Sequence, residues 1–145
     1  MCPSASLSPH QPIMVDAILS ALRVEERPDA IYVDGTVGAG GHSRAILHCR
    51  PDSYLLGMDR DPTALELAAQ NLADFGERVQ LVHRSYVEME IALSEWLDDP
   101  EPQVDGILLD LGASSMQFDT AERGFAFRLA GELDMRFDPT SDVPK

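Results

Sequence analysis

The sequence predicts an α/β domain, a parallel sheet with helices on both of its faces. Two observations predict it. Short apolar runs alternate with stretches of helical periodicity along most of the chain, and three of these runs close on an aspartate: Asp34, Asp59 and Asp110. A glycine-rich turn, residues 35–41, follows the first run and leads directly into a helical pattern. A strand, a glycine turn and a helix N-terminus together are typical of a nucleotide-type site.

Length, charge and cysteine content limit the class of protein and the partners that the chain can have. The 145 residues, 44% hydrophobic, fit one globular domain with a real core. A net charge of -14, with 11 basic and 25 acidic residues, predicts that this chain alone binds nucleic acid poorly. We expect neither a membrane span nor a secretion signal. Cys2 and Cys49 are too few and too scattered to indicate a disulfide scaffold or a metal site, which is typical of a reducing cytoplasm.

The first part of the chain predicts a tail, a helix, a strand and a second helix. Residues 1–9 are rich in Ser and Pro and are expected to be a loose tail. Pro12 suits a first helical position. The buried stripe of that helix is predicted to be Ile13, Met14, Ala17, Ile18, Ala21 and Leu22. A strand beginning at residue 31 follows, and then a helix over residues 43–49 with Ala45, Ile46 and Leu47 inward.

The same alternation continues further along the chain. It predicts strands over residues 54–59, 79–83 and 104–110, and helices over residues 62–73 and 85–97. Asp61 is expected to cap the first of these helices, and Ser85 with Glu88 forms a capping-box pattern at the start of the second. Residues 112–136 show no clear periodic element and are rich in polar and aromatic residues, as functional loops often are.

The last predicted strand is apolar on both faces, as a central strand should be. At an edge it would expose backbone donors and acceptors. We therefore expect residues 10–145 to be the N-terminal part of a cofactor-binding domain, with the rest of that domain absent.

The glycine turn does not choose its ligand by itself. Gly38 and Gly40 supply the first two glycines of a dinucleotide fingerprint, but Ser43 occupies the third position. Asp59 is placed to accept hydrogen bonds from ribose hydroxyls, which serves NAD and S-adenosylmethionine alike. Asp34, beside the turn, suits a cationic methionine end better than a pyrophosphate. The extra glycine Gly41, which opens the turn beside a histidine, also favours the sulfonium cofactor.

Six motifs in one order carry a resemblance. They are His-Gln-Pro at 10–12, Asp-Gly-Thr-Val-Gly-Ala-Gly-Gly-His-Ser at 34–43, Asp-Arg-Asp-Pro at 59–62, Asp-Gly-Ile-Leu-Leu-Asp-Leu-Gly-Ala-Ser-Ser at 105–115, Glu-Arg-Gly-Phe at 122–125 and Leu-Asp-Met-Arg at 133–136. Together they resemble the MraW family, S-adenosylmethionine-dependent methyltransferases that act on cytidine N4 of small-subunit ribosomal RNA. The resemblance spans residues 10–139. It implies a Rossmann-like methyltransferase fold, incomplete at the C-terminus.

The resemblance also implies the site. Cofactor contacts are expected at Gly40, Gly41, His42, Asp59, Tyr86, Asp110 and Gln117, with no metal. Tyr86 stands where the family usually has phenylalanine, and its ring is expected to flank the adenine. The other departures are Met116 for proline, Ala126 for serine and Phe137 for methionine. Asp110 and residues 112–115 lie where the methyl-accepting amine is expected, and no catalytic base is assigned.

The implied partner is small-subunit ribosomal RNA or the small ribosomal subunit, in the cytoplasm. Since the family's RNA-recognition insertion follows the matched part, we expect this chain alone to bind cofactor without useful RNA methylation. Two alternatives stay open: a methyltransferase of another amino group, whose usual Asp/Asn-Pro-Pro-aromatic motif is absent after Asp110, and an inactive cofactor-binding fragment.

Simpler structural roles also stay open for single residues. Asp59 and Asp110 can be turn formers, and Gly40 and Gly41 a plain entry into a helix. His42 can be a helix cap. The remaining candidates are two arginines that are either surface charges or RNA-phosphate contacts, and two phenylalanines that fit a core better than a base stack: Arg123, Arg136, Phe125 and Phe127.

Overall fold

The computed structural model describes residues 13–112, 117, 119, 121–123, 125 and 134–140. The predicted tail, the His-Gln-Pro motif, Pro12 and residues 113–116 lie outside the described residues, as do Ala126 and Phe127.

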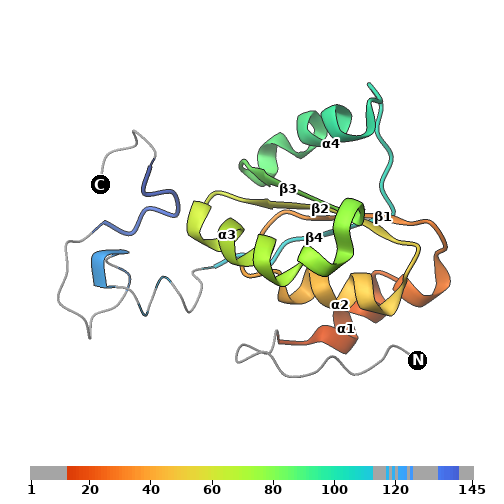
Figure 1. Cartoon of the computed structure of the whole chain (residues 1–145), viewed down its shortest axis with the longest axis horizontal. Helices are drawn as coiled ribbons and strands as arrows, with labels where there is room; N and C mark the ends of the chain where they lie inside the picture. Colours follow the sequence, from red (N-terminus) through yellow and green to blue (C-terminus); the bar gives the residue numbers. More distant parts are fainter. Residues whose placement is uncertain are drawn as a thin grey trace.

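The centre of the molecule is a parallel four-stranded sheet (Figure 1). Its strands are β1 (Ile31–Asp34), β2 (Tyr54–Asp59), β3 (Val79–His83) and β4 (Gly106–Leu108), in the order β3-β2-β1-β4. Asp34, the last residue of β1, is in register with Gly57 of β2 and Leu108 of β4. The strand order reverses between β1 and β4, and ligands of open α/β sheets bind at the carboxyl ends of the strands around such a point.

Helices cover both faces of this sheet (Figure 1). They are α1 (Val15–Ala21), α2 (Gly41–Cys49), α3 (Pro62–Asn71) and α4 (Met89–Leu97), with short 3-10 turns at η1 (Val24–Glu26), η2 (Ala73–Arg78), η3 (Tyr86–Glu88) and η4 (Ala121–Arg123). The first three α-helices pack on one face and α4 on the other. The predicted α/β class with a parallel sheet is confirmed. The turn η4 was not predicted, because the sequence around it has no periodicity.

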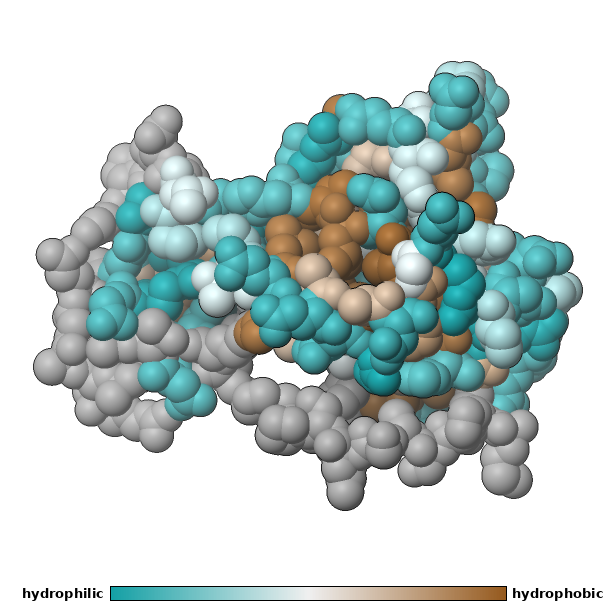
Figure 2. Space-filling model, viewed as in Figure 1, coloured by the Kyte–Doolittle hydropathy of each residue, from teal (hydrophilic) through white to brown (hydrophobic). Residues whose placement is uncertain are grey.

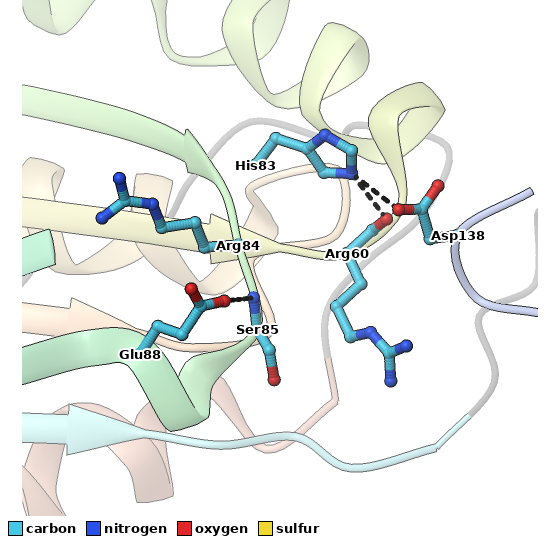
Figure 3. Close-up of a pocket in the computed structure, with 6 residues that line it drawn as sticks. All are labelled: Arg60, His83, Arg84, Ser85, Glu88 and Asp138. Atoms are coloured by element: carbon cyan, nitrogen blue, oxygen red, sulfur yellow. Dashed lines mark hydrogen bonds and ion pairs between the residues drawn. The ribbon is translucent and has the colours of Figure 1, made fainter. Parts of the chain in front are cut away.

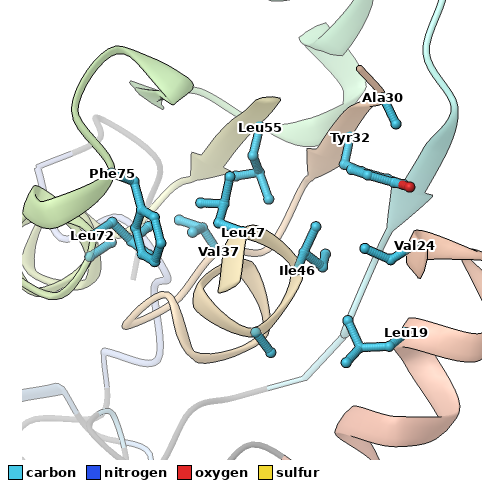
Figure 4. Packing of buried hydrophobic residues seen from close by; sticks show 12 residues of the cluster. Leu19, Val24, Ala30, Tyr32, Val37, Ile46, Leu47, Leu55, Leu72 and Phe75 are labelled. Carbon is cyan, nitrogen blue, oxygen red and sulfur yellow. The ribbon is translucent and has the colours of Figure 1, made fainter. Parts of the chain in front are cut away.

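Two apolar layers result, because successive side chains of a strand point to opposite faces. On the side of α1, α2 and α3, Tyr32 and Leu55 pack with Ile46 and Leu47 of α2 (Figure 4). On the side of α4, the buried residues are Val33, Leu56, Met58, Ala92 and Leu93. Burying each large aliphatic side chain stabilises the fold by roughly 1.5–3 kcal/mol. Ala45, Ile46 and Leu47 point inward, as predicted.

The predicted buried stripe of the first helix is wrong in most positions, although Leu22 packs against the core as predicted. Ile13 and Met14 are 79% and 68% exposed. Met14 has a φ of 62°, so the helix begins only after it, at Val15. The face turned inward is therefore that of Val15, Leu19 and Leu22, spaced four and three residues apart.

The prediction for β4 is also wrong in part. Only Gly106–Leu108 pair with β1, so β4 is shorter than the predicted strand over residues 104–110, and it lies at one edge of the described sheet. Ile107 and Leu109 are 47% and 41% exposed, because the cluster under α4 is centred on β1 and β2. At the opposite edge, Figure 2 shows hydrophobic surface over β3 between α3 and α4.

The local signals between these elements are confirmed. The Asp61 carboxylate accepts a hydrogen bond from Thr63 N at 3.0 Å and caps α3. Ser85 and Glu88 form the capping box.

Cys49 is disulfide-bonded, which the two scattered cysteines did not predict. No helix in the described ranges is long and apolar enough to cross a bilayer.

Candidate functional site

The buried Asp34 side chain holds the glycine turn after β1 through hydrogen bonds. This side chain is 1% exposed. One carboxylate oxygen accepts from Thr36 N at 3.2 Å and the other from the Ser43 hydroxyl at 2.6 Å. Burial raises the pKa of Asp34 to about 6, although both hydrogen bonds favour the charged form. Asp34 therefore ties the turn to α2 from inside the protein and does not face the crevice as a partner for a cationic ligand.

The turn needs glycine for two reasons at Gly40. Its φ is +86°, and a Cβ there would lie 3.0 Å from the side chain of Leu72. Gly40 is the N-cap of α2 and supplies no side-chain cap. The first N–H groups of a helix have no partner within the helix and attract anions. Gly40 and Gly41 thus form the entry into α2, and Gly40 N itself donates to the Val37 carbonyl at 2.8 Å within the turn.

Asp59, at the end of β2, is fixed by two backbone donors. Its carboxylate accepts from Gly38 N at 2.9 Å and from Asp61 N at 2.9 Å. The side chain is a turn former, because it binds a backbone N–H two residues on, and it also reaches across to the glycine turn. Each carboxylate oxygen has a second lone pair. The half-buried Asp59 can therefore accept hydrogen bonds from a ligand hydroxyl without leaving this position.

Tyr86, in η3, lies against the glycine turn at Gly35. A Cβ on Gly35 would stand 2.8 Å from Tyr86 Cβ and 2.5 Å from Leu109. Only glycine permits this approach. The half-buried Tyr86 ring is thus held beside the carboxyl ends of β1 and β4.

Asp110 contacts the glycine turn, whereas His42 contacts the segment before α1. Asp110 N donates to Thr36 Oγ1 at 2.7 Å, which ties the end of β4 to the turn, while the Asp110 side chain is exposed. His42 Nε2 donates to the Ile13 carbonyl at 2.9 Å, so His42 joins α2 to the segment before α1 and does not cap the helix.

Gln117 is buried beside Asp61. It is 4% exposed, and its amide nitrogen donates to Asp61 Oδ2 at 3.2 Å. Arg123 Nη2 lies 2.8 Å from the same oxygen. Burial raises the pKa of Asp61, but the hydrogen bonds from Arg123 and Gln117 outweigh it and hold the pKa below its usual value.

An open cavity of about 410 Å³ lies at the carboxyl ends of β2 and β3 (Figure 3). It is lined by Arg60, His83, Arg84, Ser85, Glu88 and Asp138. His83 bridges two of its walls, with Nε2 at 2.9 Å from the Arg60 carbonyl and 3.4 Å from Asp138. Arg60 follows Asp59 and Ser85 precedes Tyr86 in the chain. The cavity thus adjoins two of the predicted site residues.

Four of the predicted site residues contact one of two short loops, residues 34–38 and 59–61, whereas His42 contacts the segment before α1; the four are Asp59, Tyr86, Asp110 and Gln117. Sequence reasoning missed what joins them. Thr36 and Asp61 supply the connections, whereas the sequence indicates only a helix cap for Asp61. The sequence leaves a surface charge or an RNA-phosphate contact open for Arg123, but its side chain is 12% exposed and paired with Asp61 inside the protein. Phe125 is 8% exposed and belongs to the core. Within the described ranges no group of His, Cys, Asp or Glu side chains is arranged to hold a metal.

Comparison with known proteins gives a consistent result. The family model of the MraW methylase family matches residues 7–144. Ribosomal RNA small subunit methyltransferase H of Syntrophotalea carbinolica is 50% identical over 135 residues, covering 92% of this chain and 41% of the relative. The protein of the same name from Nitratidesulfovibrio vulgaris is 49% identical over 134 residues, covering 92% of this chain and 36% of the relative. The chain thus spans about two fifths of the length of the curated relatives it matches.

Two crystal structures share the fold at low identity. A candidate rRNA methylase from Clostridium thermocellum superposes with a TM-score of 0.56 at 16% identity, covering 76% of this chain and 58% of its own. Precorrin-6y C5,15-methyltransferase from Geobacter metallireducens gives a TM-score of 0.50 at 18% identity, covering 74% of this chain and 56% of its own. These likenesses concern the fold alone, which is that of Rossmann-like methyltransferases.

Proposed function

The chain belongs to the MraW methylase family, and on that premise we propose that it carries the S-adenosylmethionine site of a methyltransferase. The substrate we propose is N4 of a cytidine in small-subunit ribosomal RNA. One observation carries the proposal: Asp59 of β2 is hydrogen-bonded to Gly38 of the glycine turn, so a carboxylate suited to ribose hydroxyls is tied to the turn that leads into α2.

The residues present fit the cofactor. The N–H groups at the start of α2 suit the methionine carboxylate, since an anion is stabilised at a helix N-terminus. Asp59 suits the ribose hydroxyls, and the Tyr86 ring suits a face of the adenine. The open cavity of about 410 Å³ is lined by Arg60 and Ser85, the chain neighbours of Asp59 and Tyr86. Gln117 is the least direct of the proposed contacts, because it is buried and its amide donates to Asp61.

The chemistry requires positioning above all. When bound, the cofactor supplies an electrophilic methyl group on sulfur. The cytosine N4 amine would form the new N–C bond as the C–S bond breaks and S-adenosylhomocysteine leaves, and N4 would give up a proton to water. Holding the two reactants in line supplies most of the rate in such a transfer. The exposed Asp110 at the end of β4 marks the side of the crevice where we place the amine.

We assign the RNA contacts to the parts of the longer relatives that this chain does not match. Phosphate backbones favour basic surfaces, whereas this chain has a net charge of -14. A ribosomal substrate also supports a cytoplasmic location. The 145-residue chain is accordingly expected to bind cofactor and to transfer no useful amount of methyl to RNA.

A chimera tests the proposal directly. Residues 10–139 of this chain replace the matched part of the Syntrophotalea carbinolica relative, which is 50% identical. The chimera and the 145-residue chain are incubated with methyl-labelled cofactor and unmodified small ribosomal subunits, and the RNA nucleosides are identified by mass spectrometry. The control is the same chimera with Asp59→Asn.

We expect N4-methylcytidine from the chimera, little from the Asp59→Asn control and none from the 145-residue chain. A different methylated base would favour the other amino-group methyltransferase. Absence of any product from a folded chimera would favour an inactive cofactor-binding fragment. Robust RNA methylation by the 145-residue chain would contradict the assignment of the RNA contacts to parts of the relatives that this chain does not match.

A further inference from the structure

Two charged side chains from distant parts of the chain meet in the protein interior beside the proposed cofactor site. Asp61, the N-cap of α3, lies 2.8 Å from Arg123 of η4. Their side chains are 3% and 12% exposed. A charge pair this buried loses its hydration, so removing one partner leaves the other uncompensated. The pair therefore fixes the relative position of the two parts of the chain that carry Asp61 and Arg123.

On one side the pair holds the loop that carries the ribose acid. Asp61 N donates to Asp59 Oδ1 at 2.9 Å, while the Asp61 carboxylate accepts from Thr63 N at 3.0 Å. Asp59 in turn accepts from Gly38 N at 2.9 Å. A shift of Asp61 is thus transmitted through one hydrogen bond to Asp59 and through a second to the glycine turn.

On the other side the pair holds two later segments of the chain. Arg123 Nη2 donates to the Phe137 carbonyl at 2.9 Å, and the Arg123 carbonyl accepts from Met135 N at 2.9 Å. Phe125 packs edge-on against Phe137, with ring centroids 5.6 Å apart. Gln117 shares the same Asp61 oxygen as Arg123. One guanidinium therefore fastens the chain after β4 to the loop at the end of β2.

We infer that Arg123 is a positioning residue of the cofactor site: through Asp61 it fixes Asp59 and Gln117 in the geometry that binds the nucleoside of S-adenosylmethionine. The inference rests on the proposed cofactor. Arg123 acts through Asp61, and its guanidinium is engaged within the protein. A planar fork with several donors suits this task, because it can meet a carboxylate and a carbonyl in one plane.

The competing explanation is that the pair only stabilises the fold. A second ion pair separates the two explanations. Arg50 and Asp52, 2.8 Å apart, precede β2 and so lie at the opposite end of the sheet from Asp59. Arg50 also donates to the Glu25 carbonyl at 3.0 Å. Arg50→Gln therefore removes an ion pair and a carbonyl contact, as Arg123→Gln does, but away from the site.

The experiment compares Arg123→Gln, Arg123→Lys, Asp61→Asn and the double variant Arg123→Gln/Asp61→Asn with Arg50→Gln and the unaltered chain. For each, calorimetric titration gives the Kd for S-adenosylhomocysteine well below the melting temperature, and thermal unfolding without ligand gives the Tm. Asp61→Asn retains a side chain that caps helices well, so it serves if Arg123→Gln fails to fold.

We expect Arg123→Gln and Asp61→Asn each to weaken binding about tenfold, or about 1.4 kcal/mol. The double variant should be weakened no more than either single variant, because both act through one contact. Arg123→Lys should fall between Arg123→Gln and the unaltered chain, and Arg50→Gln should lower Tm with Kd unchanged. A Kd within twofold of the unaltered chain in folded Arg123→Gln or Asp61→Asn overturns the inference. An equal loss of affinity in Arg50→Gln overturns it too. If the unaltered chain itself fails to bind S-adenosylhomocysteine, the proposed function fails instead.

Discussion

The Ser43 hydroxyl donates a 2.6 Å hydrogen bond to Asp34, and both side chains are fully buried. This contact joins the last residue of β1 to the first turn of α2 and so shapes the glycine turn between them. Because burial raises the pKa of Asp34 to about 6, the same contact also makes the stability of the domain depend on pH.

Asp34→Asn is predicted to change that dependence. An unfolded aspartate titrates near pH 3.9, so between about pH 4 and pH 6 the folded protein holds a proton that the unfolded chain has lost. The contribution of Asp34 to the free energy of unfolding therefore falls as pH rises through this window. Asparagine can accept from Thr36 N and donate to Ser43 without titrating. The free energy of unfolding of Asp34→Asn, relative to the unaltered chain, should rise by up to about 3 kcal/mol from pH 4 to pH 7.

Denaturant unfolding at several pH values checks this prediction. Asp52→Asn is the matched control of opposite sign. The hydrogen bond from Arg50 lowers the pKa of Asp52, so this pair stabilises the fold above the unfolded pKa and the variant should lose stability as pH rises. A difference between Asp34→Asn and the unaltered chain that stays constant with pH would contradict the account of Asp34.

Gly40→Ala is predicted to weaken both the fold and cofactor binding. Alanine at a φ of +86° is strained, and its Cβ would press on Leu72 at 3.0 Å. Positions of this kind cost of order 1–3 kcal/mol. Gly76→Ala is the control, since Gly76 has a φ of +56° but no neighbour within 4 Å of an added Cβ and lies away from the turn. Thermal unfolding should show a loss for both variants, and calorimetry should show weaker S-adenosylhomocysteine binding for Gly40→Ala alone. Equal affinities for the two variants would argue against the turn as the ligand site.

Tyr86→Ala and Tyr86→Phe separate the ring of Tyr86 from its hydroxyl. Stacking of a base on an aromatic side chain contributes roughly 1–3 kcal/mol. Tyr86→Ala should therefore weaken S-adenosylhomocysteine binding about fivefold or more, whereas Tyr86→Phe should bind as the unaltered chain does. Tyr54→Ala, at the start of β2 and half exposed, should leave the affinity unchanged. If Tyr86→Ala binds normally in fluorescence or calorimetric titrations, Tyr86 does not flank the adenine.

Asp59→Asn is predicted to remove ribose recognition in particular. An amide has one acceptor oxygen where the carboxylate has two, and both carboxylate oxygens already accept from Gly38 and Asp61. The unaltered chain should bind S-adenosylhomocysteine more tightly than its 2′-deoxy analogue. In Asp59→Asn the two Kd values should converge while both become weaker. A preference that survives unchanged in the variant would place the ribose elsewhere.

The sequence predicts those features that depend on neighbouring residues. The bounds of β2 and β3, the Asp61 cap and the capping box at Ser85 all follow from local pattern, and the structure confirms them. The predicted buried face of the first helix differs from the observed one, because nothing in the apolar spacing shows that Met14 takes a positive φ and that the helix begins after it. The edge position of β4 depends on which strands pair, and a two-sided apolar run does not reveal it.

The sequence does not predict contacts between distant residues, because these contacts do not depend on local pattern. Gln117 and Asp61 are 56 positions apart, and their hydrogen bond has no local signature. The glycine pattern also suggested that Asp34 faces a ligand, whereas the fold turns this side chain inward to Ser43. Six motifs in register identified the family, but the way in which Asp61 and Arg123 join those motifs became visible only in three dimensions.

The central claim is that the glycine turn and Asp59 form a site for S-adenosylmethionine rather than for a dinucleotide. Parallel calorimetric titrations of the 145-residue chain with S-adenosylhomocysteine and with NAD test it most directly. We predict saturable binding of S-adenosylhomocysteine, weakened in Gly40→Ala, and no measurable heat of binding with NAD. Binding of NAD without binding of S-adenosylhomocysteine would contradict the claim.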